Sequence, residues 1–309
     1  MKKNITLFIA ITVICVLFSS CDSDNSSSGK QKNAPISKIA FESTRNGTYD
    51  IFVMNPDGSN IVKLTDSKML SRYPSWSPDG KKITFVSNRY KQNNFELYIM
   101  DADGANITWL TDIEGFTRWS PDGTKIAFET NRKNQRDIFV MNADGTNQIN
   151  LTDNSMADTN PTWSPDETRI AFTSERDGND EIYTMNVDGS DPVNLTNNPA
   201  KDSFPCWSPD GTKIVFSSDR SSISDIFVMN ADGSNIINLT HDIYWNIKPV
   251  WSPDGKQIAF VTLREKKSEL YRENNREIFV MNADGSDPHS ISNHPQVDDC
   301  PAWSPALNQ

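Results

Sequence analysis

Six copies of Trp-Ser-Pro divide the chain into repeats, and this periodicity restricts the possible folds more than any other feature of the sequence. Spaced 43, 44, 44, 44 and 52 residues apart, the copies begin at Trp76, Trp119, Trp163, Trp207, Trp251 and Trp303. Two further strings recur with them: an Ile-x-Phe string, as in Ile126–Phe128, and a string ending in Met, as in Asp137–Met141. A period near 44 residues with several short strands per unit is typical of a β-propeller blade.

Each repeat predicts four strands, which we name A to D in chain order. Strand A ends in the Trp before a Ser-Pro-Asp-Gly turn, strand B is Ile-x-Phe, strand C ends before Asn-Ala-Asp-Gly, and strand D is the weaker Asn-x-x-x-Leu-Thr. Strands B and C are apolar at consecutive positions, so both their faces should be buried between blades, and the more polar strand D should be the outer edge. Glu167 replaces the turn Gly in one repeat, where a left-handed backbone costs about 1 kcal/mol.

The phase of the repeat predicts how the ring closes. The repeats begin with a strand B after Lys38 and end with a strand A at Trp303. We therefore predict an all-β fold, a six-bladed β-propeller of four-stranded blades formed by residues 37–309. In it, the C-terminal strand A joins and completes the N-terminal blade.

The N-terminus has the pattern of a secretory signal. Lys2 and Lys3 precede an apolar run over residues 5–18, which is short for a membrane-spanning helix, and Ser19-Ser20-Cys21 follows. The Phe-Ser-Ser-Cys ending resembles a bacterial lipobox, which implies lipid attachment at Cys21. We expect a lipoprotein signal peptide over residues 1–20 and a polar, flexible tether over residues 21–36; a plain signal peptide cleaved nearby is the alternative.

The repeated strings also resemble those of a known family. Pro-x-Trp-Ser-Pro-Asp-Gly-x-Lys-Ile-Ala-Phe and Asp-Ile-Phe-Val-Met-Asn-Ala-Asp-Gly are similar to the WD-like repeats of the TolB β-propeller family, and the similarity covers residues 37–305. The resemblance implies the propeller fold. Some polysaccharide lyases similar to this family hold a metal with several His near the channel, but only His241 and His294 are so placed here. We therefore expect no metal and no cofactor.

Composition and cysteine placement exclude several functions. A net charge of −11 repels phosphate, which argues against nucleic-acid binding. The sequence contains no G-x-S-x-G, Walker loop, H-E-x-x-H or C-x-x-C motif, so we expect no enzyme and assign no catalytic residue. Cys206 and Cys300 fall in strands A of blades separated by one blade, too far apart for a disulfide.

Charged residues recur at two positions of the repeat. An Arg ends every strand B: Arg45, Arg89, Arg132, Arg176, Arg220 and Arg264. An acid opens every strand C: Asp50, Glu96, Asp137, Glu181, Asp225 and Glu277. Regular recurrence favours a structural ion pair across the B–C hairpin; a ring of anion sites is the alternative.

The variable loops carry the candidate binding site. The B–C and D–A loops share one face and differ between repeats, as binding loops on a rigid scaffold do; the longest spans residues 264–276. Near the start of the A strands lie the acids Glu114, Asp158, Asp202, Asp298 and Asp299. Beside them, just before the Pro or its equivalent, stand Tyr73, Phe116, Asn160, Phe204, Lys248 and Cys300. No repeat position fixes these residues, so we expect an exposed rim, either suited to a basic peptide, a sugar or a cation, or merely solvated.

Two hypotheses for function follow. The first is a lipid-anchored, non-catalytic and monomeric propeller of the bacterial cell envelope, on the periplasmic side or at the outer membrane or cell surface. It would bind an envelope protein or peptide through its variable face. The alternative is a carbohydrate-binding or polysaccharide-lyase-like propeller.

Overall fold

The strands predicted from the repeat form a closed ring of six blades. The computed structural model describes residues 37–66, 68–90, 94–113, 115–131, 135–241, 243–263 and 275–306. In these residues, 24 strands make six antiparallel sheets of four, which confirms the predicted six-bladed propeller. The predicted signal peptide, the tether and Cys21 lie outside the described residues.

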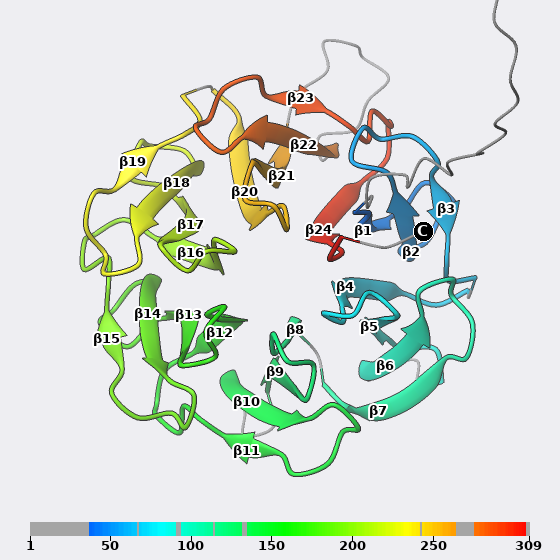
Figure 1. Ribbon diagram of the computed structural model, residues 1–309, viewed down its shortest axis with the longest axis horizontal. Coiled ribbons are helices and arrows are strands. Elements are labelled where there is room, and N and C mark those ends of the chain that lie inside the picture. Colours follow the sequence, from blue (N-terminus) through cyan, green and yellow to red (C-terminus); the bar gives the residue numbers. More distant parts are fainter. Residues whose placement is uncertain are drawn as a thin grey trace, which may run out of the picture. The chain divides into compact units, whose positions relative to one another are not determined.

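Each sheet runs from an innermost strand A to an outermost strand D (Figure 1). The A strands are β4 (Ser71–Trp76), β8 (Thr117–Trp119), β12 (Asp158–Trp163), β16 (Asp202–Trp207), β20 (Trp245–Trp251) and β24 (Asp298–Trp303). The B strands are β1 (Ile39–Ser43), β5 (Lys82–Ser87), β9 (Lys125–Thr130), β13 (Arg169–Ser174), β17 (Lys213–Ser218) and β21 (Gln257–Leu263). The C strands are β2 (Asp50–Met54), β6 (Glu96–Asp101), β10 (Asp137–Asn142), β14 (Glu181–Asn186), β18 (Asp225–Asn230) and β22 (Arg276–Asn282). The D strands are β3 (Val62–Lys63), β7 (Thr108–Asp112), β11 (Ile149–Asn150), β15 (Val193–Asn194), β19 (Ile237–Asn238) and β23 (His289–Ser290).

Burial follows the predicted order of strands. Every residue of β1 and β2 is buried, and the other B and C strands are buried nearly throughout, because both faces of a blade pack against its neighbours. The D strands have two residues in five of the blades and stay partly exposed. Short, partly polar outer strands limit edge-to-edge pairing with other chains.

The A–B turns show the predicted chemistry. In the fifth blade, Gly211 donates its N–H to the Ser208 carbonyl, and the Ser208 hydroxyl donates to Asp210 at 2.6 Å. The turn glycine has φ of 71°, and Glu167 adopts φ of 60° at the same position of the fourth blade. Glu167 therefore occupies the strained left-handed conformation that its position predicts.

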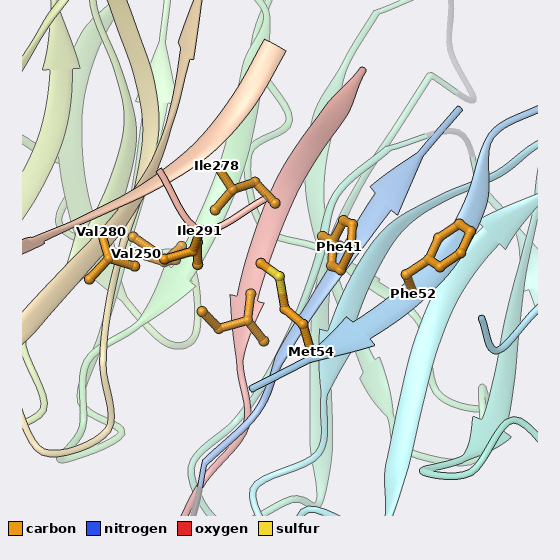
Figure 2. Packing of buried hydrophobic residues seen from close by; sticks show 9 residues of the cluster. Phe41, Phe52, Met54, Val250, Ile278, Val280 and Ile291 are labelled. Carbon is orange, nitrogen blue, oxygen red and sulfur yellow. The ribbon is translucent and has the colours of Figure 1, made fainter. Parts of the chain in front are cut away.

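Strand β24 closes the ring as predicted. It pairs with β1 in the register Ile39↔Trp303 and Ser43↔Asp298, and the Ser304 N–H donates to the Lys38 carbonyl at 2.7 Å. Figure 2 shows the apolar cluster at this junction, where Phe41 and Met54 pack with residues of the sixth blade. The cluster consists of Ile39, Phe41, Phe52, Met54, Val250, Ala259, Ile278, Val280 and Ile291.

A second contact joins the same two blades at the C–D turn. Gly58 has φ of 80°, and a Cβ there would lie 2.0 Å from the Ile291 carbonyl oxygen. Gly233 makes the equivalent approach to Leu195, so a glycine at this turn lets each blade contact the preceding one. Among the described residues, none belongs to a helix of the length and apolarity that crossing a bilayer requires.

Candidate functional site

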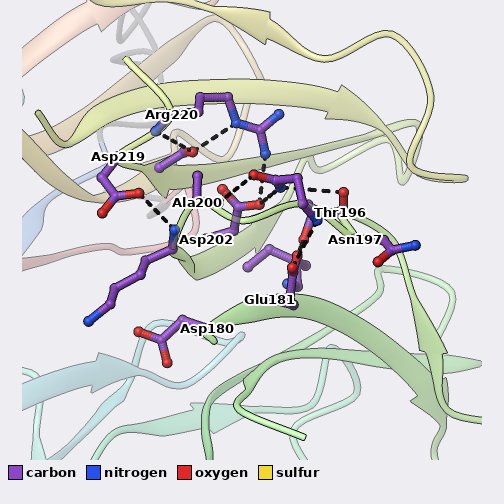
Figure 3. Close-up of polar contacts among 12 residues, drawn as sticks. Asp180, Glu181, Thr196, Asn197, Ala200, Asp202, Asp219 and Arg220 are labelled. Atoms are coloured by element: carbon purple, nitrogen blue, oxygen red, sulfur yellow. Dashed lines mark hydrogen bonds and ion pairs between the residues drawn. The ribbon is translucent and has the colours of Figure 1, made fainter. Parts of the chain in front are cut away.

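Three of the arginines that end strand B pair with an acid of strand A, so the prediction that they pair with the acid opening strand C is wrong for them. Arg132 and Arg264 lie outside the described residues, and Ser71 takes the place of the strand-A acid in the blade of Arg89. With N–O distances of 2.8, 3.1 and 2.7 Å, the pairs are Arg45–Asp298, Arg176–Asp158 and Arg220–Asp202. Arg220 Nε also donates to the Ser218 hydroxyl oxygen at 2.8 Å, and its guanidinium lies over the rings of Phe216 and Phe227. These contacts fix the guanidinium of Arg220 inside its own blade (Figure 3).

The acids that open strand C have different partners. Asp225 accepts hydrogen bonds from the Thr240 hydroxyl at 2.9 Å and from the Asn238 amide at 3.0 Å. The Thr240 oxygen in turn accepts the Ile226 N–H at 2.9 Å. Glu181 and Thr196 repeat the arrangement in the fourth blade (Figure 3). These strand-C acids therefore hold strand D to the blade. Arg45, Arg176 and Arg220 pair with strand-A acids instead.

This pairing removes three predicted site residues from the exposed rim. Asp158, Asp202 and Asp298 each have 0% exposure, so the expectation of solvent-exposed acids is wrong for them. The cause is the ion pair with the arginine of the same blade, which compensates the cost of burying each carboxylate. Burial nevertheless raises the pKa of Asp298, although Ser43 and Arg45 act against that shift. Glu114 lies outside the described residues.

Six residues directly precede the strand-A proline, or Thr117 in its place, and surround the channel. We call these residues the ring positions. With φ between 53° and 56°, five of them are left-handed: Tyr73, Asn160, Phe204, Lys248 and Cys300. A β-bulge in each of these A strands accompanies that conformation. The exception is Phe116, which precedes Thr117 instead of a proline, and its short strand β8 pairs with β9 without a bulge.

The backbone of the ring positions has a structural task that the sequence analysis did not foresee. The Tyr73 and Asn160 N–H groups donate to the Glu42 and Glu129 carboxylates of the preceding blades at 2.9 and 2.8 Å. The hydroxyls of Thr173 and Ser217 accept the corresponding N–H groups of Phe204 and Lys248 at 3.2 and 3.0 Å. Neighbouring blades are thus joined through the backbone at these positions, and the side chains are free to differ.

Three of those side chains form an aromatic cluster at the channel mouth. The ring centroids of Tyr73 and Phe116 lie 4.4 Å apart, and those of Phe116 and Phe204 lie 5.8 Å apart. Lys248 Nζ lies 5.8 Å from the centroids of both Phe116 and Phe204, a cation–π arrangement. The sequence placed these four residues at one mouth, and the structure brings them into contact although they belong to four different blades.

Lys248 also anchors an ionic cluster between the sixth and first blades. Its ammonium donates to Asp299 at 2.7 Å and to the Cys300 sulfur at 3.2 Å, and Arg276 binds the same Asp299 carboxylate. Burial alone would lower the pKa of Lys248, but the negative charge of Asp299 and its other neighbours holds that pKa above its ordinary value. Lys248 is therefore a fixed cation at the channel mouth.

The ionic cluster does not suit a metal ion. Glu42, Asp299 and Cys300 place potential ligand atoms within 4.8 Å of one another, and this group from the described residues includes no histidine. Arg72 already binds Glu42 at 2.8 Å, while Lys248 and Arg276 bind Asp299. Burial raises the pKa of the Cys300 thiol, which disfavours the thiolate that metals require. Cys206 and Cys300 are both free thiols.

The ring positions lie where a wide funnel narrows into the channel. The funnel has a volume of about 720 Å³ and extends over the B–C and D–A loops of the third and fourth blades, including Gln135, Met156 and Glu175. The narrow part holds about 20 Å³ between prolines of the A strands. Phe116, Asn160, Phe204 and Lys248 line both spaces. A ligand that enters from the variable face and reaches the narrow part would contact these side chains.

Two channel residues were missed by the sequence analysis. Arg118 lines the narrow part, and Glu129, 5% exposed, lines the funnel. Glu129 packs so closely against Gly115 that a Cβ on that glycine would lie 2.1 Å from the Glu129 Cγ. Burial raises the pKa of Glu129 above its ordinary value. Arg118 departs from the repeat by charge, and Glu129 shares its position in strand B with Glu42 alone, so a position-by-position comparison of the six repeats would have found both.

A closed ring of six four-stranded blades defines a class of protein, the β-propellers. The family comparison makes the class specific: a family model described as TolB beta propeller domain matches residues 31–194 and 90–272. The chain belongs to this TolB β-propeller family.

Individual relatives agree over shorter segments. The Tol-Pal system protein TolB of Geobacter metallireducens is 48% identical over 46 residues, which are 15% of this chain and 11% of that protein. The crystal structure of TolB from Acinetobacter baumannii superposes with a TM-score of 0.74 at 22% identity, covering 87% of this chain and 66% of that one. Oligogalacturonate lyase from Vibrio parahaemolyticus superposes with a TM-score of 0.56 at 14% identity, covering 82% and 74%. The two structural similarities show the shared fold alone.

Proposed function

We propose that the protein is a lipid-anchored, non-catalytic propeller of the bacterial envelope that binds a protein or peptide partner on its variable face. The observation that carries the proposal is the half-buried aromatic cluster of Tyr73, Phe116 and Phe204 at the bottom of a funnel of about 720 Å³. Aromatic side chains in a concave site often supply most of the binding energy for a partner. Membership in a family that includes proteins named for the Tol-Pal system supports a partner in the envelope.

The N-terminal sequence supports the location. A basic start, a short apolar run and Ser-Ser-Cys21 fit a lipoprotein signal, and the polar segment that follows would let the propeller reach a partner away from the membrane. The chemistry of the described channel residues supports binding rather than catalysis. Lys248 is held by Asp299, and Glu129 accepts a backbone N–H, so these groups already have structural partners.

The proposal is tested by capturing partners from an envelope extract of the source bacterium. The wild-type protein is compared with Phe116→Ala/Phe204→Ala, which removes two of the three aromatic anchors. We expect the double variant to bind the captured protein at least about tenfold more weakly, because interface energy concentrates in such anchors. Calorimetry with the recovered partner measures the affinities.

Trp109→Ala is the matched control. Trp109 is a 55% exposed aromatic residue on the outer strand β7, far from the funnel lining, and its loss should leave the affinity unchanged. Equal affinity of the wild type and the double variant, at comparable melting temperature, would contradict the proposal. Binding of the wild type to a glycan array, with no protein captured, would favour the carbohydrate alternative.

A further inference from the structure

One side chain in the channel breaks the sixfold repeat by its charge. Arg118 lies on the innermost strand β8, between Thr117 and the repeat Trp. At the equivalent position the other five A strands carry small or apolar, uncharged residues: Ser75, Thr162, Cys206, Val250 and Ala302. Because the A strands surround the channel, this substitution places a guanidinium in the channel at a strand position that the other blades leave uncharged.

The guanidinium has few partners for so enclosed a position. Its Nη1 donates to the Thr117 carbonyl at 3.1 Å, and within the described part of the chain it makes no ion pair. An arginine offers five N–H donors, so most of its hydrogen-bonding capacity remains available. Burial lowers the pKa of Arg118, and Glu129 is a carboxylate that acts against this shift. Arginine stays protonated despite such a shift, so the site carries a lasting positive charge.

Arg118 shares its cavity with a second cation. Arg118 and Lys248 both line the narrow space of about 20 Å³, whose walls also include five prolines, Val250, Asn160, Cys300 and the rings of Phe116 and Phe204. A volume of this size accepts a group not much larger than a water molecule, such as one end of a carboxylate. Lys248 uses two of its three N–H donors on Asp299 and Cys300, which leaves one for a ligand.

The charges around the channel favour an anionic group. Arg118 and Lys248 are the charged residues that line the narrow part, and both are cations. The wider funnel beyond it has a mixed lining, with Glu129, Glu175 and Asp180 beside Arg136 and Lys248. The narrow part is therefore positive, although the whole chain has a net charge of −11. A positive site enclosed by low-dielectric walls concentrates its field on whatever enters the funnel.

We propose that the narrow end of the funnel is a carboxylate-binding site formed by Arg118 and Lys248, and that the partner peptide inserts a carboxylate there. An acidic side chain and the C-terminus of a chain both supply this group. The inference rests on the proposed function, which it deepens by naming the chemistry of the partner. An exposed acidic rim would have suited a basic partner. Because Asp158, Asp202 and Asp298 are buried in their own ion pairs, the proposed site suits an acidic partner instead.

The first test uses sodium acetate as the probe, with the neutral isostere acetamide beside it. Thermal unfolding of the full-length protein is followed at increasing probe concentration, because a ligand that binds only the folded state raises the melting temperature. We expect acetate, and not acetamide, to stabilise the wild type. Arg118→Gln should weaken the binding of acetate at least about tenfold, because hydrogen bonds to charged groups are stronger than those between neutral groups. Arg118→Lys should restore part of the effect.

Arg169→Gln is the matched control, because Arg169 pairs with Asp191 near the opposite turns and should leave the acetate response unchanged. Equal stabilisation of the wild type and Arg118→Gln by acetate would overturn the inference. The variants are first compared without probe, and Arg118→Lys keeps the test valid if Arg118→Gln folds poorly.

The second test uses the captured partner and synthetic peptides of its segments. Peptides with a free C-terminal or side-chain carboxylate should bind in an Arg118-dependent way, and their amidated forms should bind at least about tenfold more weakly. If free and amidated peptides bind equally while Phe116→Ala/Phe204→Ala still loses the partner, the carboxylate inference is overturned and the proposed function stands. If neither the double variant nor Arg118→Gln changes partner binding, the proposed function fails as well. Galacturonic acid is the last probe. If it stabilises the protein at lower concentrations than acetate does, and only when Arg118 is present, a sugar supplies the carboxylate and the peptide is overturned as its source.

Discussion

Asp202 shows how one residue becomes part of the scaffold although it lies beside the channel mouth. Its side chain is fully buried, with Arg220 at 2.7 Å and the Asn198 amide also at 2.7 Å. The guanidinium of Arg220 lies over the neighbouring rings of Phe216 and Phe227, which hold it in place. At the scale of residues, the channel mouth therefore combines acids fixed by the fold with ring positions whose side chains vary.

Replacing Asp202 tests this structural role. Asp202→Asn keeps the shape but leaves Arg220 without its counter-charge, so we expect the free energy of unfolding to fall by about 3 kcal/mol. Glu175→Gln removes the same charge at an exposed position of the same face and should change stability by less than about 0.5 kcal/mol. Urea unfolding measures both, and equal midpoints for the two variants would contradict the role assigned to Asp202.

At the scale of elements, strand β24 joins the two ends of the chain. It pairs along the length of β1, places Trp303 beside the apolar cluster of the first and sixth blades, and carries Asp298 to Arg45. Without β24, the inner edge of β1 would present unpaired N–H and C=O groups. The first blade thus depends on residues more than 240 positions away in the sequence, since Ser43 faces Asp298.

Removing part of β24 should open the ring. Deletion of residues 300–309 removes Trp303, whose loss alone costs about 3 kcal/mol or more, and exposes the edge of β1. We expect a fall in melting temperature of about 10 °C or more, together with aggregation. Deletion of residues 307–309 is the control and should leave unfolding unchanged. Calorimetric traces that coincide for both deletions would mean that β24 does not stabilise the ring.

At the scale of the whole molecule, the propeller presents one variable face and one uniform face. The uniform face consists of A–B and C–D turns fixed by Asp and Gly, as in Asp210, Gly211 and Gly233. The variable face opens into the funnel, where the proposed partner binds. A lipid at Cys21 would hold the proposed binding module at the membrane surface, and a flexible tether over residues 21–36 would let it reach a partner.

The anchor predicts a simple change of location. Cys21→Ser removes the proposed attachment site, so the protein should move from the membrane fraction to the soluble fraction of the envelope. Cys206→Ser, a thiol inside the propeller, should stay with the membrane. Fractionation followed by immunoblotting measures both. A Cys21→Ser protein that remains membrane-bound after its signal is cleaved would rule out lipid attachment at Cys21.

The sequence by itself determined the fold, because the fold is repeated in it six times. Each Trp-Ser-Pro and each Met-containing string predicts the same local strands and turns, and the phase of the repeats predicts that β24 pairs with β1. The left-handed turn residue Glu167 was also predictable, since its conformation depends on local position alone. The ring positions were found because they differ between copies of a regular repeat.

The tertiary structure alone decided which charges are available to a ligand. Periodicity gives the order of residues along a strand, but the partner of a charged side chain depends on which strand lies beside it and on which blade faces it. The sequence pairs Arg220 with Asp225, the acid that opens the next strand. In the structure the guanidinium packs over the rings of Phe216 and Phe227 and binds Asp202. The same long-range packing brings Arg118 and Lys248, which are 130 positions apart in the sequence, to one narrow cavity. The positive charge of the proposed site therefore follows from the tertiary structure, because Arg118 and Lys248 belong to different blades.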